Sequence, residues 1–266
     1  MEMNYNYHTH TFRSHHASGT PEEYVLRAIE NGVKYMGFSD HVPMLFDDGK
    51  QSGHRIPIDQ GKAYVDEIKA LAKKYKKQID IKVGFEVEYY TKYFNKVLND
   101  AIEWGADYMI LGPHFYAPEN EGNIHACTQT TDECHLKNYV NNIISAMSEG
   151  AFTYIAHPDM INFVGDVEIY NREIERMCKA SKMYKVPLEI NFLGIRDSRN
   201  YPTEKFWNIA GKVGCPVTFG FDAHDAKAAF DGESLIKAKE MVEIFNLNYI
   251  GRPKILPLKK GVIIDH

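Results

Sequence analysis

The sequence lacks the long apolar run that a membrane-spanning helix requires. No segment of its 266 residues approaches the roughly 18 consecutive apolar residues of such a helix. The first ten residues, MEMNYNYHTH, carry neither the basic region nor the apolar stretch of a secretory signal. Cysteine is scarce, and the four cysteines are separated by 7, 44 and 37 positions, which matches no thiolate metal motif. We therefore expect a cytoplasmic protein with reduced thiols and no membrane partner.

A basic excess, typical of proteins that bind nucleic acids, is also missing. The net charge is −5, from 31 basic and 36 acidic residues, whereas neutralisation of phosphates dominates affinity for nucleic acids. Three motifs are absent from the places where they would act: the Gly-x-x-x-x-Gly-Lys-Ser/Thr loop, the Gly-x-Gly-x-x-Gly turn and the Gly-x-Ser-x-Gly elbow. We therefore expect no nucleic-acid partner, and a small phosphorylated substrate stays compatible with the charge.

What the sequence does contain is a repeated order of short apolar run, loop and amphipathic helix. Seven runs have the length of buried parallel strands, namely 5–7, 35–38, 79–85, 108–111, 152–156, 187–190 and 216–219. Helical patterns occupy 20–31, 59–75, 132–148, 168–184, 203–213 and 234–245. This alternation predicts an α/β fold, a closed or nearly closed parallel barrel ahead of an open doubly wound sheet. No Pro-, Gly- or Ser-rich linker interrupts it, so residues 1–266 are predicted to form one domain.

Reactive side chains follow these predicted strands directly. In an α/β barrel, the carboxyl ends of the strands form the active-site face. Six segments that are far apart in the sequence should therefore meet at one mouth, a pattern that core packing does not require. The residues are His8, His10, Asp40, His41, Glu86, His114, His157, Asp222 and His224.

Spacing and chemistry indicate a metal site. His8 and His10, like Asp222 and His224, are two positions apart, and such side chains point the same way from an extended chain. Glu86 ends an apolar run, where a carboxylate is costly to bury unless it is paired or binds a metal. Glu88 is expected at the rim instead.

Imidazoles with two carboxylates favour zinc, manganese or iron over calcium or magnesium. Three divalent cations would bring a charge of about +6 against about −2 from Glu86 and Asp222. The surplus favours a phosphate dianion and a metal-bound hydroxide, as in multi-metal displacement at phosphorus.

These motifs resemble the PHP family, named for polymerases and histidinol phosphatases. They span nearly the whole chain: His8-Thr9-His10, Ser39-Asp40-His41, Gly84-Phe85-Glu86, His114, His157 and Asp222-Ala223-His224. The histidinol-phosphatase branch is most similar in 37–43, in 64–88 and in His157-Pro158-Asp159. The resemblance implies a distorted (β/α)7 barrel, similar to a TIM barrel, with a trinuclear metal centre.

The resemblance also implies how the ligands are shared among three divalent transition metals. One metal would take His8, His10, Glu86 and Asp222. A second would share Glu86 and add His114 and His157, and the third would take a loop histidine with His41 and His224. His16 lies six residues after His10, as the family's loop histidine does. His15 is the alternative, because Ser14-His15-His16-Ala17 replaces the usual Cys-Pro-His-Gly.

The function implied by the resemblance is hydrolysis of a phosphomonoester, with L-histidinol phosphate of histidine biosynthesis as the expected substrate. A metal-bridging hydroxide would attack phosphorus. Arg196 matches an arginine that binds the phosphate, with Arg199 as the alternate. Asp222, His224 and His41 are the candidates for catalytic roles.

Two other functions stay open. One is a phosphatase or phosphodiesterase of the same fold that acts on another small phosphate ester or a nucleotide. The other is a silent metal-binding domain that serves a partner, and the complete ligand set argues against it.

Two segments differ from the histidinol phosphatases: the Gly112-Pro113 dipeptide before His114, and the 116–131 loop after it. The sequence carries no signal for oligomeric state.

Overall fold

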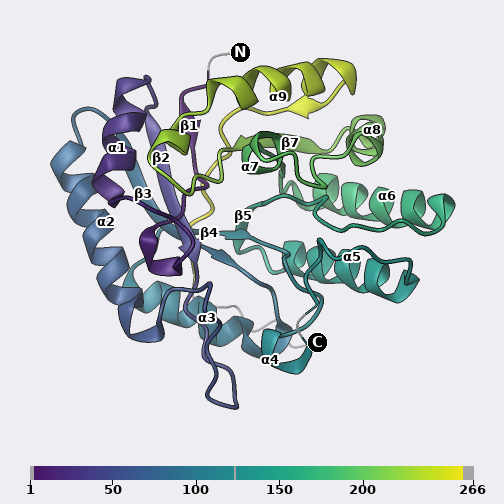
Figure 1. Ribbon diagram of the computed structural model, residues 1–266, viewed down its shortest axis with the longest axis horizontal. Coiled ribbons are helices and arrows are strands. Elements are labelled where there is room, and N and C mark those ends of the chain that lie inside the picture. Colours follow the sequence, from purple (N-terminus) through teal and green to yellow (C-terminus); the bar gives the residue numbers. More distant parts are fainter. Residues whose placement is uncertain (1–2, 123, 260–266) are drawn as a thin grey trace.

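The computed structural model describes residues 3–122 and 124–259. Eight parallel strands form one sheet in the order in which they occur in the chain. They are β1 (Tyr5–Asn6), β2 (Tyr35–His41), β3 (Asp80–Val87), β4 (Tyr108–Leu111), β5 (Phe152–Ile155), β6 (Leu188–Asn191), β7 (Pro216–Gly220) and β8 (Asn248–Tyr249). The sheet curls, and the connecting helices surround it, with α1 and α2 on the left of Figure 1 and α5 and α6 on the right.

The helices are α1 (Pro21–Glu30), α2 (Gly61–Tyr75), α3 (Thr91–Trp104), α4 (Glu119–Gly122), α5 (Glu133–Ser148), α6 (Val167–Tyr184), α7 (Phe192–Arg196), α8 (Glu204–Val213) and α9 (Gly232–Ile244). Single-turn 3-10 helices occupy Phe12–Ser14, Ile58–Gln60 and Lys227–Ala229. The start of α1 follows from local chemistry, because Thr20 and Glu23 form a reciprocal capping box ahead of Pro21. Among the described residues, none of these helices combines the length and apolarity needed to cross a bilayer.

The distorted TIM-like barrel predicted from the sequence is confirmed. Its seven expected strands are present, and β2 and β3 run further than predicted, as far as His41 and Val87. Of the α-helices and strands, four were not predicted: α3, α4, α7 and β8. Of these, α3 had a readable signal, because its buried residues Tyr93, Phe94, Val97, Leu98 and Ala101 have helical spacing.

The barrel closes through the segments that follow β1 and β7. Thr9 and Ala223 form a parallel bridge. His10 N donates to the carbonyl of Ala223 at 2.9 Å, and Ala223 N donates to the carbonyl of His8 at 3.2 Å. At the opposite end of β7, the short strand β8 pairs with Pro216 and Val217 instead. The first and last chemistry-bearing segments are therefore side by side.

The interior of the barrel depends on close approach at two glycines. The ring of Tyr108 lies against Gly37 and Gly84, and a Cβ at Gly84 would lie 2.6 Å from the ring. The Tyr108 hydroxyl donates to the carbonyl of Tyr7 at 2.8 Å, so this side chain links β4 to the end of β1. Packing in the interior thus holds the strand that carries the first two histidines.

The segment after β8 crosses the amino ends of the strands. The guanidinium of Arg252 stacks at 3.5 Å over the ring of Tyr35 at the start of β2. Further on, Leu256 N donates to the hydroxyl of Thr153 in β5 at 3.2 Å. This covering leaves the carboxyl ends of the strands as the open face.

Candidate metal centre

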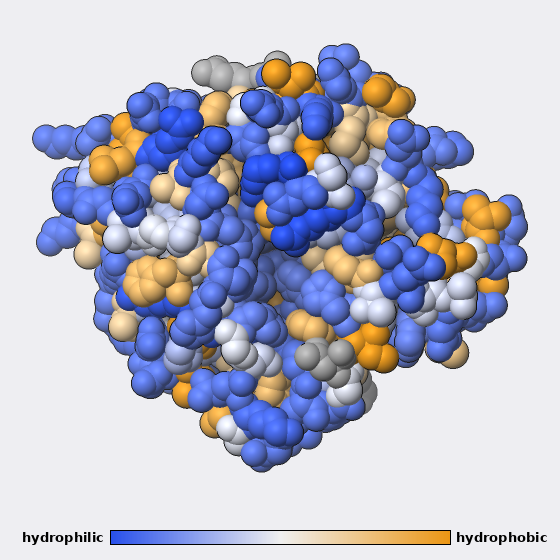
Figure 2. All heavy atoms as spheres, viewed as in Figure 1, coloured by the Kyte–Doolittle hydropathy of each residue, from blue (hydrophilic) through white to orange (hydrophobic). Residues whose placement is uncertain are grey.

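A cavity of about 540 Å³ opens at the carboxyl ends of the strands. Hydrophilic side chains gather around the middle of the face shown in Figure 2. Seven of the nine predicted metal-site residues line the cavity: His10, His16, His41, Glu86, His114, Asp222 and His224. The other two, His8 and His157, are fully buried beside them, with Nε2 atoms 3.5 Å and 2.9 Å from Glu86. All nine predicted residues therefore come together.

The donor atoms group into sets with metal-binding spacing. Four sets of three donors have all their atoms within 4.8 Å of one another. They are His8–His10–Asp222, His8–Glu86–His157, His41–Glu86–His114 and His10–His16–His41. His224 belongs to none of these sets, but its ring stacks on His10 at 4.3 Å and lies 4.9 Å from His16.

Glu86 lies at the centre of the cluster. Its carboxylate oxygens are within 3.6 Å of ring nitrogens of five imidazoles: His8, His10, His41, His114 and His157. It can approach this closely because of Gly112 on the neighbouring strand end, where a Cβ would lie 2.3 Å from Glu86 Oε1.

Two buried carboxylate oxygens at this centre, Glu86 Oε2 and Asp222 Oδ1, make no well-oriented hydrogen bond among the described residues and face imidazole nitrogens at distances from 3.1 to 3.5 Å. Buried carboxylates of this kind are normally paired or bound to a cation. With the surrounding imidazoles, they form a donor set that fits transition-metal cations.

Three further carboxylates orient the imidazoles from outside the cluster. Glu189 accepts from His8 Nδ1 at 2.8 Å, Asp40 lies 3.3 Å from His10 Nδ1, and Glu88 lies 2.6 Å from His114 Nδ1. Each contact occupies Nδ1 and leaves Nε2 for the centre, the arrangement that supports metal-binding histidines. The expectation that Glu88 lies at the rim is wrong, because its side chain is buried against His114.

The sequence analysis did not predict a role for Glu189, although an acidic residue within an apolar run could have indicated one. It interrupts the apolar run of β6 in the same way that Glu86 interrupts β3, and it is fully buried. Its Oε2 also accepts from His157 N at 3.0 Å and from Asn191 Nδ2 at 2.9 Å. Gly220 provides the space, since a Cβ there would lie 1.7 Å from Glu189 Oε1.

The imidazoles and carboxylates of the site shift each other's pKa values. Burial lowers the pKa of His10, but the hydrogen bonds and charges of Asp222, Asp40 and Glu86 outweigh burial and raise it to about 9. Burial opposes ionisation of Glu86, yet the surrounding imidazoles hold its pKa well below the usual range.

The outer carboxylates also change the charge balance expected from the sequence. Five acidic groups, rather than two, lie around the cluster, so the charge facing three divalent cations would be more negative than the −2 expected from Glu86 and Asp222 alone. The positive surplus would then be smaller than predicted.

The loop after the first strand presents His16 to the cavity. Its ring lies 5.6 Å from that of His10 and 5.1 Å from that of His41, and its Nδ1 bonds to the carbonyl of Ser14 at 2.6 Å. His15 ends the turn with a φ of 63° and is not among the residues that line the cavity. The geometry therefore favours His16 as the loop ligand.

Of the two arginines predicted to bind the substrate phosphate, one lines the cavity and the other does not. Arg199 lines the cavity, with NH1 3.2 Å from the hydroxyl of Tyr201 and NH2 3.3 Å from the carboxylate of Asp197. Arg196 does not line it, because its guanidinium binds Asp231 at 2.8 Å and donates to the carbonyl of Asp222 at 3.3 Å. Arg196 thus ties α7 to the loop and helix that follow β7.

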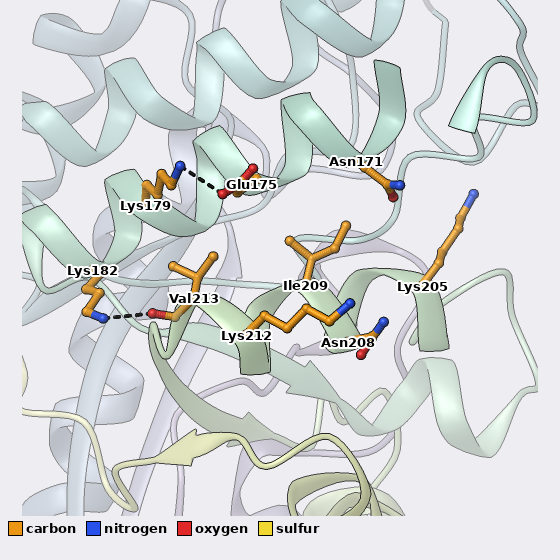
Figure 3. Close-up of a pocket in the computed structure, with 9 residues that line it drawn as sticks. All are labelled: Asn171, Glu175, Lys179, Lys182, Lys205, Asn208, Ile209, Lys212 and Val213. Carbon is orange, nitrogen blue, oxygen red and sulfur yellow. Dashed lines mark hydrogen bonds and ion pairs between the residues drawn. The ribbon is translucent and has the colours of Figure 1, made fainter. Parts of the chain in front are cut away.

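A second cleft, of about 570 Å³, lies between α6 and α8 and is lined by four lysines (Figure 3). Lys179 is paired with Glu175 at 2.8 Å, and Lys182 donates to the carbonyl of Val213 at 2.7 Å. No histidine is among the residues that line it. Among the described residues, the groups of potential metal ligands therefore lie at the barrel mouth and not in this cleft.

The barrel and its histidine- and carboxylate-lined mouth define an α/β protein with a candidate multi-metal site. The chain belongs to the PHP domain family, whose model matches residues 6–192. This match covers His8 to His157, whereas Asp222 and His224 lie beyond it.

Several relatives of known name match most of the chain. A probable histidinol-phosphatase of Deinococcus radiodurans is 26% identical over 226 residues, which cover 82% of this chain and 85% of that protein. The histidinol-phosphatase of Bacillus subtilis is 22% identical, with 82% of this chain and 92% of that protein covered.

Among solved structures, the histidinol phosphate phosphatase of Lactococcus lactis has a TM-score of 0.69 at 19% identity, covering 97% of this chain and 99% of that chain. That structure was determined with zinc, L-histidinol and phosphate. The likeness supports the distorted barrel.

Proposed function

We propose that this protein is a metal-dependent phosphomonoesterase that hydrolyses L-histidinol phosphate. The observation that carries the proposal is the convergence of seven imidazoles, Glu86 and Asp222 around one cavity, with two buried carboxylate oxygens that make no well-oriented hydrogen bond at its centre. The named relatives support the choice of substrate.

Three divalent cations (zinc, manganese or iron) would be held by side chains that already lie close together in the cluster. His8, His10, Glu86 and Asp222 would hold one cation. Glu86, His114 and His157 would hold the second, and His16, His41 and His224 the third. When bound, such cations supply Lewis acidity and lower the pKa of a water molecule.

The remaining steps fall to side chains of this chain. Arg199 is a permanent cation that lines the cavity, and its guanidinium would bind phosphate oxygens. Asp222, His224 and His41 line the cavity at the level of the cluster, where they would hold and orient the cations, and water in the cavity would supply the proton that the departing alkoxide needs. The buried carboxylates Asp40, Glu88 and Glu189 would hold the imidazoles in place during the reaction.

Phosphate release tests this proposal. Protein reconstituted separately with zinc, manganese and iron should hydrolyse L-histidinol phosphate faster than glycerol phosphate, nucleoside monophosphates and a phosphodiester. Glu86→Gln keeps the size of the central residue and should weaken binding of the two cations that Glu86 would share and abolish activity. A fully metal-loaded parent protein that releases phosphate from none of these esters would refute the proposal.

A further inference from the structure

The cleft between α6 and α8 lies outside the metal centre and has a charge opposite to that of the whole chain. Four lysines and one acidic residue, Glu175, line it, which gives a lining charge of +3 on a chain whose net charge is −5. The lysines are Lys179, Lys182, Lys205 and Lys212. The cleft is therefore a basic site on an acidic protein, and the proposed hydrolytic reaction does not account for it.

The lining residues form one stripe on each helix. The α6 stripe is Asn171, Glu175, Lys179 and Lys182, and the α8 stripe is Lys205, Asn208, Ile209, Lys212 and Val213. Steps of three or four residues place side chains on one face of a helix. The α6 stripe is about 16 Å long, at 1.5 Å per residue. Two facing stripes thus make an elongated groove.

Most of the positive charge in the cleft is not cancelled by a carboxylate. Within the part of the chain that the structure describes, Lys179 is the one lysine of the four with an ion-pair partner. The amine of Lys182 donates to the carbonyl of Val213 at 2.7 Å, and that of Lys205 to the carbonyl of Phe163 at 2.8 Å. Burial lowers the pKa of Lys205, as expected of an amine without a counter-ion. Three positive charges are therefore left for an anionic ligand.

The amines are spread along the cleft and do not meet at one point. Figure 3 shows Lys179 and Lys182 at one end, Lys205 at the other end and Lys212 between them. A single phosphate or sulfate ion is bound best by donors that converge on it. The arrangement instead fits an extended ligand with several negative charges.

The remaining lining residues favour a peptide over a nucleic acid. Ile209 lies in the middle of the cleft, and the carboxamides of Asn171 and Asn208 lie between it and Lys205 in Figure 3. Carboxamides both donate to and accept from peptide groups, and Ile209 offers an apolar contact. None of the described residues that line the cleft is aromatic, so bases would find no ring on which to stack.

We propose that this cleft is a docking site for an acidic segment of a partner protein, an extended run of Asp and Glu that includes an apolar residue. Its carboxylates bind the lysines at the two ends of the cleft, and its apolar residue lies against Ile209. About five residues of an extended chain span the α6 stripe. The docking site does not depend on the chemistry proposed for the barrel mouth.

Binding of a labelled peptide tests the docking site. The probe is a fluorescein-labelled, glutamate-rich peptide with a central leucine, titrated with the purified protein and followed by fluorescence anisotropy. A second peptide, with glutamine in place of every glutamate, is the uncharged control. The acidic peptide should bind and the glutamine peptide should not, and the affinity should fall as the salt concentration is raised.

Charge reversal locates the binding site. Lys182→Glu combined with Lys212→Glu reverses one amine on each helix and should weaken binding of the acidic peptide about tenfold or more. Lys182→Ala with Lys212→Ala should act in the same direction but less. Lys73→Glu with Lys77→Glu is the matched control, because both lysines are exposed and lie at the end of α2, across the molecule from α6 (Figure 1). The control variant has the same net charge as the first and should bind like the parent.

Thermal unfolding and phosphate release should be unchanged in all these variants, since none of the substituted lysines lines the metal-site cavity. Equal affinity for the two peptides, no binding of either at low salt, or equal losses in the two charge-reversed variants would overturn the docking site. A single-stranded oligonucleotide that binds the cleft more tightly than the acidic peptide would overturn the choice of a protein partner. A protein that binds the peptide but releases no phosphate refutes the proposed hydrolysis and leaves the docking site standing.

Discussion

Glu189 shows how a residue outside the metal cluster can control it. Its one carboxylate binds the ring of His8, the backbone of His157 and the amide of Asn191. Asn191 in turn donates to Asp222 at 3.0 Å. One buried side chain thus orients groups from β1, β5, β6 and β7.

Replacing Glu189 with Gln should weaken metal binding about 10- to 100-fold, because the amide can no longer enforce the same ring orientation and basicity on His8. Competition with a buffered chelator would measure this affinity. Glu173→Gln is the matched control, since Glu173 is also buried but is paired with Arg172 and Arg176 on α6. A loss of affinity as large in the control would mean that Glu189 acts through general stability.

The contrasting positions of the two arginines give a second prediction. Arg199→Ala should lower kcat/KM by roughly 10- to 150-fold, because a charge-assisted phosphate contact of about 1.5–3 kcal/mol is lost. Arg196→Ala should have a smaller effect, since Arg196 does not line the cavity and its guanidinium is bound to Asp231 at 2.8 Å, closer than Arg199 is to Asp197 at 3.3 Å. Neither change should alter metal content, measured by elemental analysis. The reverse order of effects would show that Arg196 leaves Asp231 to bind the substrate.

Metal uptake should release protons. A histidine must be neutral to coordinate a cation, whereas the carboxylates around His10 raise its pKa to about 9. Below about pH 9 the cation therefore displaces a proton, and the apparent affinity should fall as the pH is lowered. Calorimetric titration of chelated protein in buffers of different ionisation enthalpy would count these protons. Binding without proton release at pH 7 would contradict the raised pKa.

At the scale of elements, the buried pair of Arg55 and Glu119 joins the loop after β2 to α4. Arg55 is 2% exposed, and its NH1 also donates to the carbonyl of Val42 at 3.4 Å. The pair fixes two loops that have little regular structure of their own.

Arg55→Met should lower the free energy of unfolding by about 3–5 kcal/mol, because Glu119 is left buried without its counter-ion. The double variant with Glu119→Gln should recover part of that loss, since no uncompensated charge remains. Urea unfolding of the parent, both single variants and the double variant would measure the coupling. Strictly additive losses would mean that the two side chains do not stabilise each other.

The sequence predicted the barrel and the positions of its reactive residues because both follow from local patterns. Apolar runs mark the strands, and His, Asp or Glu directly after a run mark the open face. The short strand β8 has two residues and no such pattern. The positions of His54, Phe115 and His125 along the cavity depend on how two irregular loops meet, which no spacing in the sequence records. The rim expectation for Glu88 failed because alternation along β3 does not reveal the partner His114.

Buried acidic groups of the barrel are gathered at one end of its core, around the cluster. Divalent cations that bind there offset this charge, so the folded state should gain stability by binding them. Chelation should therefore lower the midpoint of thermal unfolding, and zinc should restore it in a concentration-dependent way. Glu86→Gln should show a smaller response to zinc than the parent. An unchanged midpoint after verified removal of metal would contradict a stabilising role for the cluster.

The bridge between Thr9 and Ala223 has a consequence for biosynthesis. His8 and His10 are synthesised more than 200 residues before Asp222 and His224. Until then, the two histidines lie on an unpaired strand edge without the carboxylate that shares their site. The complete metal site can therefore assemble only after Asp222 and His224 have been synthesised, and a chain terminated before them lacks it although it retains most of its histidines.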